Sequence, residues 1–245
     1  TLVVDDEADL AGLPQAAIDA AAQRAEEKGM GGMWVFGLDN ASVMPFLQFD
    51  DNRELRTKLL NGYLNRGNND DANDNKAIIV EMVNLYNQKA KIMGYDNYAE
   101  FVLEDRMAKT PEAVYNLLDQ LWTPALKSAR RELADMYPIA KAQGVNDELT
   151  AADWRYYFEK AKAEKFNLSE DELKPYFKFE NVREGIFYVA NRLYGITFTQ
   201  LNNVPVPHPE AQAFECKDAD GSTLGIIFMD MFARPGYKRG GGWGG

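Results

Sequence analysis

The sequence predicts a mainly α-helical chain with a small antiparallel β-sheet near its C-terminal end. Three observations support this fold class. Apolar residues recur at helical spacing through most of residues 1–195. Residues that typically begin and end helices bound many of these stretches. After residue 195, two β-rich runs lie on either side of Asp220-Gly221, a dipeptide typical of hairpin turns.

The first helices are placed by proline, glycine and apolar spacing. The alanine-rich stretch 13–28 has Pro14 near its start and Gly29 just past its end, which is the usual order of these residues around a helix. Residues 51–65 and 75–93 each place apolar side chains on one helical face. These side chains are Leu55, Leu59 and Tyr63 in the first stretch and Ile78, Ile79, Met82, Leu85 and Tyr86 in the second.

A long helix is predicted from Thr110 to Gln143. Thr110 is a typical N-cap, and Pro111 suits the first helical position. Pro124 and Pro138 lie inside the stretch. We expect each of them to kink or interrupt the helix, because proline has no backbone donor.

Further helix starts are expected between residues 150 and 195. Thr150 and Asp153 have the spacing of a capping box, with aspartate in place of glutamate, and a second such box lies at 169–172. Asn181 is the expected N-cap of a helix over 182–194, which ends at the following glycine.

The strands are expected at residues 33–38, 214–218 and 223–232, where β-branched and aromatic residues gather. The chain is therefore expected to have two parts. Residues 1–195 are mostly helical, and residues 196–245 form a β-hairpin region that ends in a glycine-rich edge strand.

Composition excludes several classes of function. Lys and Arg total 27 and Asp and Glu total 38, which gives a net charge of −11. An acidic chain without a basic tract is a poor partner for nucleic acid or for an anionic membrane. No apolar run approaches the roughly 18 residues that a membrane helix needs. The single cysteine, Cys216, excludes an internal disulfide framework and fits the cytoplasm and the periplasm equally. A cytoplasmic location is the favoured expectation, with the periplasm as the alternative.

The single histidine, His208, excludes most self-contained zinc chemistry. A His-Glu-x-x-His motif needs two histidines, and a Ser-His-Asp triad would have to use this one. His208 lies between two prolines, and the nearest acids in the sequence are Glu210 and Asp218. A structural or surface histidine is the favoured interpretation over a metal ligand or a base.

Three other patterns have functional and structural interpretations. Counting from Asp71 as position one, a calcium loop fails because Lys76 replaces the glycine at position six and Met82 replaces the glutamate at position twelve. Glycines 240, 242 and 245 match a dinucleotide fingerprint, but no helix follows them, so a strand that needs close backbone approach is favoured. The aromatic cluster 154–157 is interpreted as core, with Arg155 pairing an acid, and a substrate-cleft face is the alternative.

The ends of the chain suggest a segment of a longer protein. The chain opens on Thr1 without a basic and apolar leader pattern, and it closes on glycines around Trp243. The alternative is a mature chain with a glycine tail.

The chain resembles the thimet oligopeptidase and neurolysin family of zinc peptidases, and within it the bacterial dipeptidyl carboxypeptidase branch. The matching stretches follow the family's order across nearly the whole chain. They are Arg66–Asn69, Asp74–Lys76, Gly94–Ala99, Met107–Ala113, Asp153–Tyr157, Leu173–Phe177, Ala190–Gly195, Val206–Pro209, Phe232–Pro235 and Lys238–Trp243.

This resemblance implies a helical segment of a two-lobed, zincin-like peptidase with a deep channel for short peptides. The family binds zinc through His-Glu-x-x-His and a further glutamate, and the motif glutamate is the general base. The family's zinc helix follows the stretch that this chain matches. The segment is therefore expected to hold no catalytic residue and no metal ligand, to bind no zinc and to be inactive alone. His208 matches a position that is not a zinc ligand.

The resemblance also suggests where substrate binds. The family's glycine-rich strand, here Arg239–Trp243, lies beside the active-site cleft, and an extended peptide can pair with an exposed strand edge. Gly240, Gly241 and Trp243 are the expected substrate-binding residues. The expected partners are short peptides and the remaining segments of the same peptidase, with both parts of this chain in one larger catalytic domain. The alternative is a non-catalytic helical peptide-binding module on a peptidase-derived scaffold.

Overall fold

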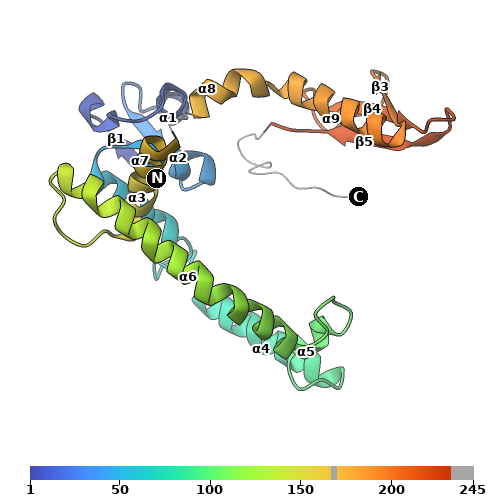
Figure 1. The fold of residues 1–245 in the computed structure, drawn as a ribbon, viewed down its shortest axis with the longest axis horizontal. Helices are drawn as coiled ribbons and strands as arrows, with labels where there is room; N and C mark the ends of the chain where they lie inside the picture. The colour runs from blue at the N-terminus through green and yellow to red at the C-terminus, as the bar shows by residue number, and fades with distance from the viewer. Residues whose placement is uncertain (167–169, 233–245) are drawn as a thin grey trace. The chain divides into compact units, whose positions relative to one another are not determined.

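The computed structural model describes residues 1–166 and 170–232. Its contacts divide the chain into two compact units, Thr1–Asn167 and Leu168–Gly245. The elements of each unit are labelled in Figure 1. This division groups residues 168–195 with the β-strands. The expected parts 1–195 and 196–245 of one larger catalytic domain stay a prediction.

The first unit is mostly helical. Its two strands, β1 (Leu2–Val4) and β2 (Trp34–Phe36), pair antiparallel with Val3 opposite Val35. The strand expected at 33–38 is thus confirmed, whereas β1 was not predicted. The remaining elements are the 3₁₀ helix η1 (Glu7–Leu10) and the helices α1 (Gln15–Glu27), α2 (Asn40–Phe49), α3 (Arg53–Leu64), α4 (Lys76–Ile92), α5 (Tyr98–Leu103), α6 (Pro111–Ala142) and α7 (Ala151–Phe166).

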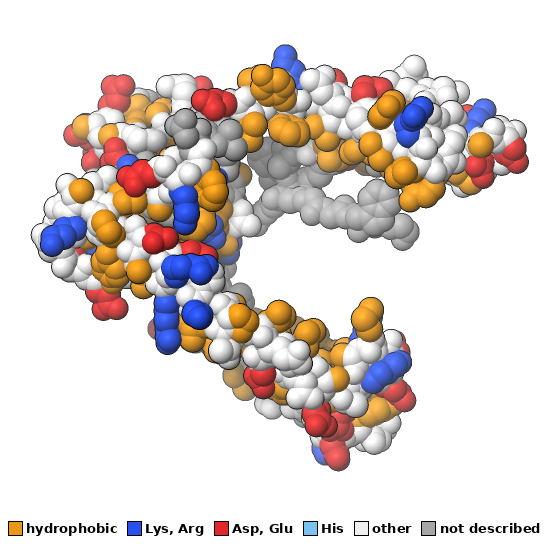
Figure 2. Space-filling model, viewed as in Figure 1, with side chains coloured by type: hydrophobic (Ala, Val, Ile, Leu, Met, Phe, Trp, Pro, Cys, Tyr) orange, Lys and Arg blue, Asp and Glu red, His pale blue; other side chains and the backbone are white. Residues whose placement is uncertain are grey.

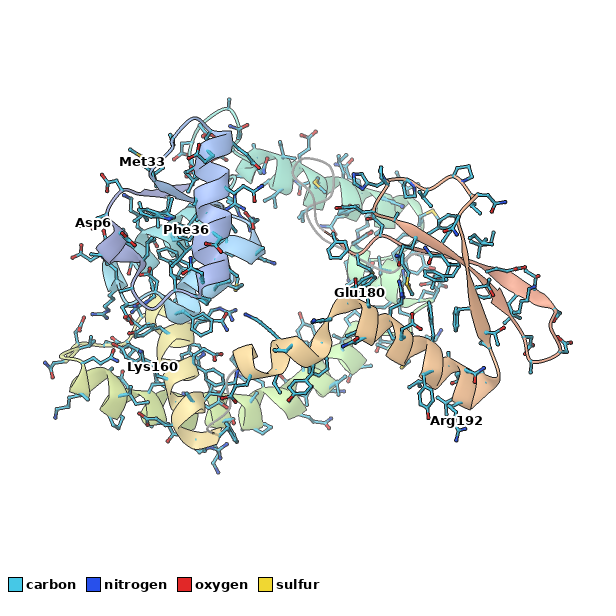
Figure 3. The ribbon with its side chains drawn as sticks, turned by 90° about the horizontal axis from the view of Figure 1, so that it is seen from above. Asp6, Met33, Phe36, Lys160, Glu180 and Arg192 are labelled. Carbon is cyan, nitrogen blue, oxygen red and sulfur yellow. The ribbon has the colours of Figure 1, made fainter. Side chains whose placement is uncertain are left out.

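Two clusters of buried side chains form the core of this unit. In the larger one, the Phe36 and Phe46 rings meet edge to face with centroids 4.6 Å apart. Figure 3 shows Phe36 among the helices of this cluster, with Asp6 and Met33 near its edge. The second cluster joins the end of α6 to α7 through Met136, Ala140, Tyr156 and Tyr157.

The helix ends follow the expected capping chemistry. The Thr110 hydroxyl accepts a hydrogen bond from the Ala113 backbone N–H at 3.2 Å, and Pro111 is the first residue of α6. The expected interruption of α6 at Pro124 and Pro138 does not occur, because the helix is continuous over its 32 residues. Each proline removes only one backbone donor, and the surrounding turns keep their hydrogen bonds.

Gly12 allows the loop after η1 to lie against the link between α2 and α3. Its φ is +88°, a left-handed conformation, and the Ala11 carbonyl accepts a hydrogen bond from the Asp51 N–H at 2.9 Å. A Cβ added at Gly12 would lie 2.1 Å from the Phe49 carbonyl oxygen. Only glycine therefore permits this contact.

We predict that Gly12→Ala destabilises the first unit through both backbone strain and this clash. The strain alone costs about 1–2 kcal/mol, and the clash adds to it. Urea unfolding measures the loss. Gly29→Ala is the matched control, because Gly29 has φ +70° but no atom within 4 Å of an added Cβ. Equal losses in the two variants would contradict the close contact.

The second unit contains a helix and a three-stranded sheet. Its described elements are α8 (Glu170–Leu173), the 3₁₀ helix η2 (Lys174–Phe177), α9 (Phe179–Tyr194), β3 (Thr197–Leu201), β4 (Gln212–Lys217) and β5 (Thr223–Met229). The antiparallel strands follow the order β3-β4-β5. The hairpin between β4 and β5 is confirmed, and its turn places Gly221 at φ +86°. Strand β3 was not predicted.

Helix α9 begins earlier than the sequence suggested. Its first residue is Phe179 and its N-cap position is Lys178, so the assignment of Asn181 as the cap is wrong. The extended backbone at Lys178 already turns the chain into the helix, which leaves Asn181 inside the first turn. The C-terminal end is as expected, because Gly195 has φ +74°. The box at 169–172 begins at Ser169, which lies outside the described residues.

Aromatic contacts hold α9 on one face of the sheet. The Phe187 ring stacks on Phe198 with centroids 4.1 Å apart and meets Phe214 edge to face at 5.0 Å. Figure 3 shows Glu180 and Arg192 at opposite ends of α9, where an acidic first turn and a basic last turn favour the helix dipole. Within the described chain, no helix is both long and apolar enough to cross a membrane.

Candidate functional site

The residues expected to bind substrate lie at the C-terminal end of the chain. Gly240, Gly241 and Trp243 fall outside the described residues, as do the glycines of the dinucleotide pattern. The described structure that leads toward them is the sheet of the second unit. Its last strand, β5, ends at Met229.

Strand β5 has one paired edge and one open edge within residues 170–232. It pairs antiparallel with β4, with Ile227 opposite Phe214 and Ile226 opposite Glu215. In the described part of the sheet, no strand lies beyond β5. The side chains on one of its faces, Leu224, Ile226 and Phe228, are about half exposed. An open edge of this kind can accept another extended segment through main-chain hydrogen bonds.

The cysteine of the central strand is not an activated nucleophile. Cys216 lies on β4, and burial raises the pKa of its thiol. A raised pKa reduces the thiolate fraction at neutral pH, and the thiolate is the reactive form.

His208 lies in a local turn rather than in a metal site. Its Nδ1 accepts a hydrogen bond from the Glu210 backbone N–H at 3.3 Å and lies 3.6 Å from the Glu210 Oε2. The described residues contain no group of three His, Cys, Asp or Glu side chains that could hold a metal ion. With one histidine in the whole sequence, these residues do not fit the zinc site that the resemblance implies.

The loop that begins near Asp71, in which the calcium pattern fails, is stabilised by a lysine side chain. The Lys76 Nζ lies 2.6 Å from the Asp70 Oδ1 and 3.1 Å from the Asp74 Oδ2. Hydrogen bonds from the backbone N–H groups of Lys76 and Asp70 lower the pKa of Asp74, and the Lys76 ammonium adds to this effect. The ammonium thus supplies the positive charge that this exposed loop needs.

The buried polar centre of the first unit is the carboxylate of Asp153. It is 0% exposed and accepts hydrogen bonds from Arg53 Nη2 at 2.8 Å and Arg56 Nη2 at 3.1 Å. It also accepts from the Thr150 N–H at 2.9 Å and hydroxyl at 3.0 Å, which is the carboxylate half of the expected capping box. The Asp153 N–H donates to the Thr150 carbonyl at 3.0 Å instead of to the hydroxyl. Burial alone raises its pKa, but hydrogen bonds, from Arg53 above all, outweigh burial and lower the pKa to about 2.

The aromatic cluster beside Asp153 belongs to the core. Tyr156 and Tyr157 are buried, and their rings meet edge to face at 5.0 Å. The Tyr156 hydroxyl donates to the Asp51 Oδ1 at 2.6 Å, and the Arg56 guanidinium lies 4.0 Å from the Tyr156 ring centroid. The core interpretation is confirmed for these two tyrosines. The arginines that pair with the acid of this helix are Arg53 and Arg56 of α3, whereas Arg155 is exposed.

Sequence reasoning missed these two arginines. They are three residues apart on α3, so they lie on one helical face, and this spacing was the available signal. Nothing in the local pattern identifies their partner, because Asp153 follows Arg53 by 100 residues.

We predict that Asp153→Asn strongly destabilises the first unit. The change leaves the buried Arg56 without its carboxylate, and breaking a buried pair from one side typically costs about 3–5 kcal/mol. Urea unfolding gives the value. Asp147→Asn is the control, because Asp147 also pairs with Arg53 but is exposed to solvent. A loss in that control as large as in Asp153→Asn would refute the central role of Asp153.

We also predict that the free energy of unfolding falls at acid pH because Asp153 becomes protonated. Its pKa is about 2 in the folded chain and 3.8 for the unperturbed group, so the folded state holds this proton less tightly. The stabilisation is therefore complete above about pH 4 and disappears as the pH falls toward 2, a change of about 2 kcal/mol. Unfolding free energies from pH 6 to pH 2 measure it. The wild type must lose more stability than Asp153→Asn over this range.

Comparison with known proteins identifies the family. The family model described as Peptidase family M3 matches residues 46–245. A dipeptidyl carboxypeptidase of Escherichia coli (strain K12) is 38% identical over 243 residues, which cover 99% of this chain and 36% of that protein. Oligopeptidase A of the same organism is 36% identical over 247 residues, with 99% of this chain and 36% of the relative covered.

A plant relative extends the comparison. The organellar oligopeptidase A of Arabidopsis thaliana is 34% identical over 250 residues, which cover 98% of this chain and 31% of the relative. The chain belongs to Peptidase family M3. It spans about a third of the length of the curated relatives that it matches.

Proposed function

We propose that this chain forms part of the catalytic domain of a zinc metallopeptidase that hydrolyses short peptides and releases dipeptides from their C-termini. The observation that carries the proposal is the family match over residues 46–245. Relatives that are similar over 99% of the chain are named dipeptidyl carboxypeptidase and oligopeptidase A. The first of these names supports the release of C-terminal dipeptides.

Zinc and the catalytic groups come, in this proposal, from residues outside this chain. The chain has one histidine, and its described acids and cysteine do not converge into a metal site. The dipeptidyl carboxypeptidase of Escherichia coli is almost three times as long as this chain, because the match covers nearly all of the chain but only 36% of that relative. The 245 residues then supply scaffold and part of the substrate cleft. A cytoplasmic location is part of the proposal, with the periplasm as the alternative, and the single cysteine is compatible with both.

Exposed apolar helix faces support a role as part of a larger fold. On α6, the side chains of Leu121 and Trp122 are 56% and 66% exposed in the described structure. Figure 2 shows hydrophobic side chains on the visible surface along α4 and α6 and around α9. The exposed members on α4 are Ile78, Ile79, Val80, Met82, Val83, Leu85 and Tyr86. Continuous apolar surface of this kind marks a packing interface.

Within the proposed cleft, Gly240, Gly241 and Trp243 bind the substrate backbone and a flanking side chain. They follow β5, whose open edge ends 11 residues before Gly240, counted from Met229. Glycine lets another main chain approach closely, and tryptophan supplies a large apolar contact.

The first experiment measures zinc content and peptidase activity on the same preparation of the 245-residue chain, with a peptide that has a free C-terminus. We expect no stoichiometric zinc and no dipeptide release from this chain. A longer protein that adds the remaining part of a relative is expected to give both. Stoichiometric zinc together with dipeptide release by the 245 residues alone would refute the proposed division of the site.

A second experiment separates a peptidase part from a finished binding module. We expect the chain to bind an apolar fluorescent dye and to self-associate, and the double change Leu121→Gln and Trp122→Gln to reduce both without loss of stability. Leu59→Ala is the contrasting variant, because Leu59 is buried and its truncation costs about 2–5 kcal/mol. A monomeric chain that binds no dye and unfolds cooperatively would favour the non-catalytic module.

A further inference from the structure

A buried carboxyl group lies in the short link between α2 and α3. Asp50 is 0% exposed, and its Oδ1 accepts a hydrogen bond from the Asn52 N–H at 2.8 Å. Its Oδ2 is buried and has no hydrogen-bond partner among the described residues. An ionised carboxylate has two oxygens that both need donors, so a bare buried oxygen strongly disfavours the charged form.

The charges around Asp50 also oppose its ionisation. Asp51 is its chain neighbour, and Asp9 of η1 accepts a hydrogen bond from Asn52 Nδ2 at 2.8 Å, so two more carboxyl groups meet at this link. Arg56 is the cation that faces Asp50. The charged and titratable groups that α7 contributes to this region are Asp153, Tyr156 and Lys160.

The one facing guanidinium is already shared. Arg56 Nη1 donates to the main-chain carbonyl of Asp50 at 2.7 Å, its Nε donates to the Ala152 carbonyl at 3.2 Å, and its Nη2 donates to Asp153. The cation therefore stabilises the Asp50 main chain and the Asp153 carboxylate, and it gives no hydrogen bond to the Asp50 side chain. Lys160 lies 3.8 Å from the Asp51 Oδ1 and neutralises that group instead.

We propose that Asp50 is a proton-operated switch: the folded chain holds it as a neutral acid below neutral pH, and its ionisation loosens the junction of α2, α3 and α7. Burial raises the pKa of Asp50 from 3.8 to about 7, because desolvation outweighs the hydrogen bond from Asn52 and the charge of Arg56. The switch rests on this local geometry and holds whether or not the chain is part of a peptidase.

The same residues connect the switch to the rest of the unit. The Asp50 carbonyl and the Asp51 carboxylate hold Arg56 and Tyr156, which carry the contacts of α3 and α7. The link itself lies under the loop at Gly12, whose added Cβ would be 3.1 Å from the Asp51 side chain. A charge that draws water toward Asp50 therefore disturbs three elements at once.

The sign of the pH dependence follows from the proton count. Above about pH 4 the unfolded chain releases the Asp50 proton, whereas the folded chain keeps it until about pH 7. Folding stability therefore falls as the pH rises between these values and levels off above them. The equilibrium constant for folding decreases by up to about tenfold for each pH unit in this window.

The test compares urea unfolding of the full chain at pH 5, 6, 7 and 8 for the wild type, Asp50→Asn and Asp119→Asn. The last is the matched control, because Asp119 is exposed on α6. We expect the folding constant of the wild type, relative to Asp50→Asn, to fall by about 30- to 100-fold from pH 5 to pH 7. Asp119→Asn should follow the wild type. Titratable groups that the wild type and Asp50→Asn share contribute equally to both, so their effect cancels in the comparison.

A second measurement does not depend on the variant. The carboxyl carbon of Asp50, sequentially assigned by NMR in the wild-type chain, should titrate near pH 7, well above the value of 3.8 for an unperturbed aspartate. An Asp50 carbon that titrates near pH 4, or identical pH dependence in the wild type and in a folded Asp50→Asn, would overturn the proposal.

Discussion

The carboxylate of Asp153 is the interaction on which the first unit depends. It caps the start of α7 and binds two arginines of α3, so one buried anion joins segments about 100 residues apart in the chain. Removing an anion from water is costly, and only a full set of charged and neutral donors offsets that cost. The donors come from α3 and from the residue before α7, so both helices must be in place for the charge to be stable.

Two buried aspartates in this unit have pKa values shifted in opposite directions for physical reasons. Asp153 receives donors from Arg53, Arg56 and Thr150, and its pKa falls to about 2. Asp50 lies close by but receives only the Asn52 N–H, and its pKa rises to about 7. Both side chains are 0% exposed, and burial raises the pKa of each. Hydrogen-bond donors decide which acid is ionised.

The family match and the surface of the chain support the same function. The chain is a member of Peptidase family M3 and spans about a third of the length of its relatives. Within its described residues, apolar side chains of α4, α6 and α9 are exposed to solvent. Covering such apolar faces with other parts of a fold lowers the free energy of the folded state. In the described part of the sheet, the open edge of β5 offers a comparable opportunity for backbone pairing. Scaffold and part of the substrate cleft are therefore the roles that we propose for these 245 residues.

Local sequence was enough to place most of the helices, several of their caps and the hairpin, because these depend on residues within a few positions of one another. Thr110 with Pro111, Thr150 with Asp153, and Gly195 acted as their types predict. The presence of a single histidine likewise limits the metal chemistry that the chain can perform by itself. Long-range packing settled the pairing of Arg53 and Arg56 with Asp153 and the raised pKa of Asp50. Those outcomes depend on desolvation and on donors brought from distant parts of the chain, and local sequence patterns carry no information about either.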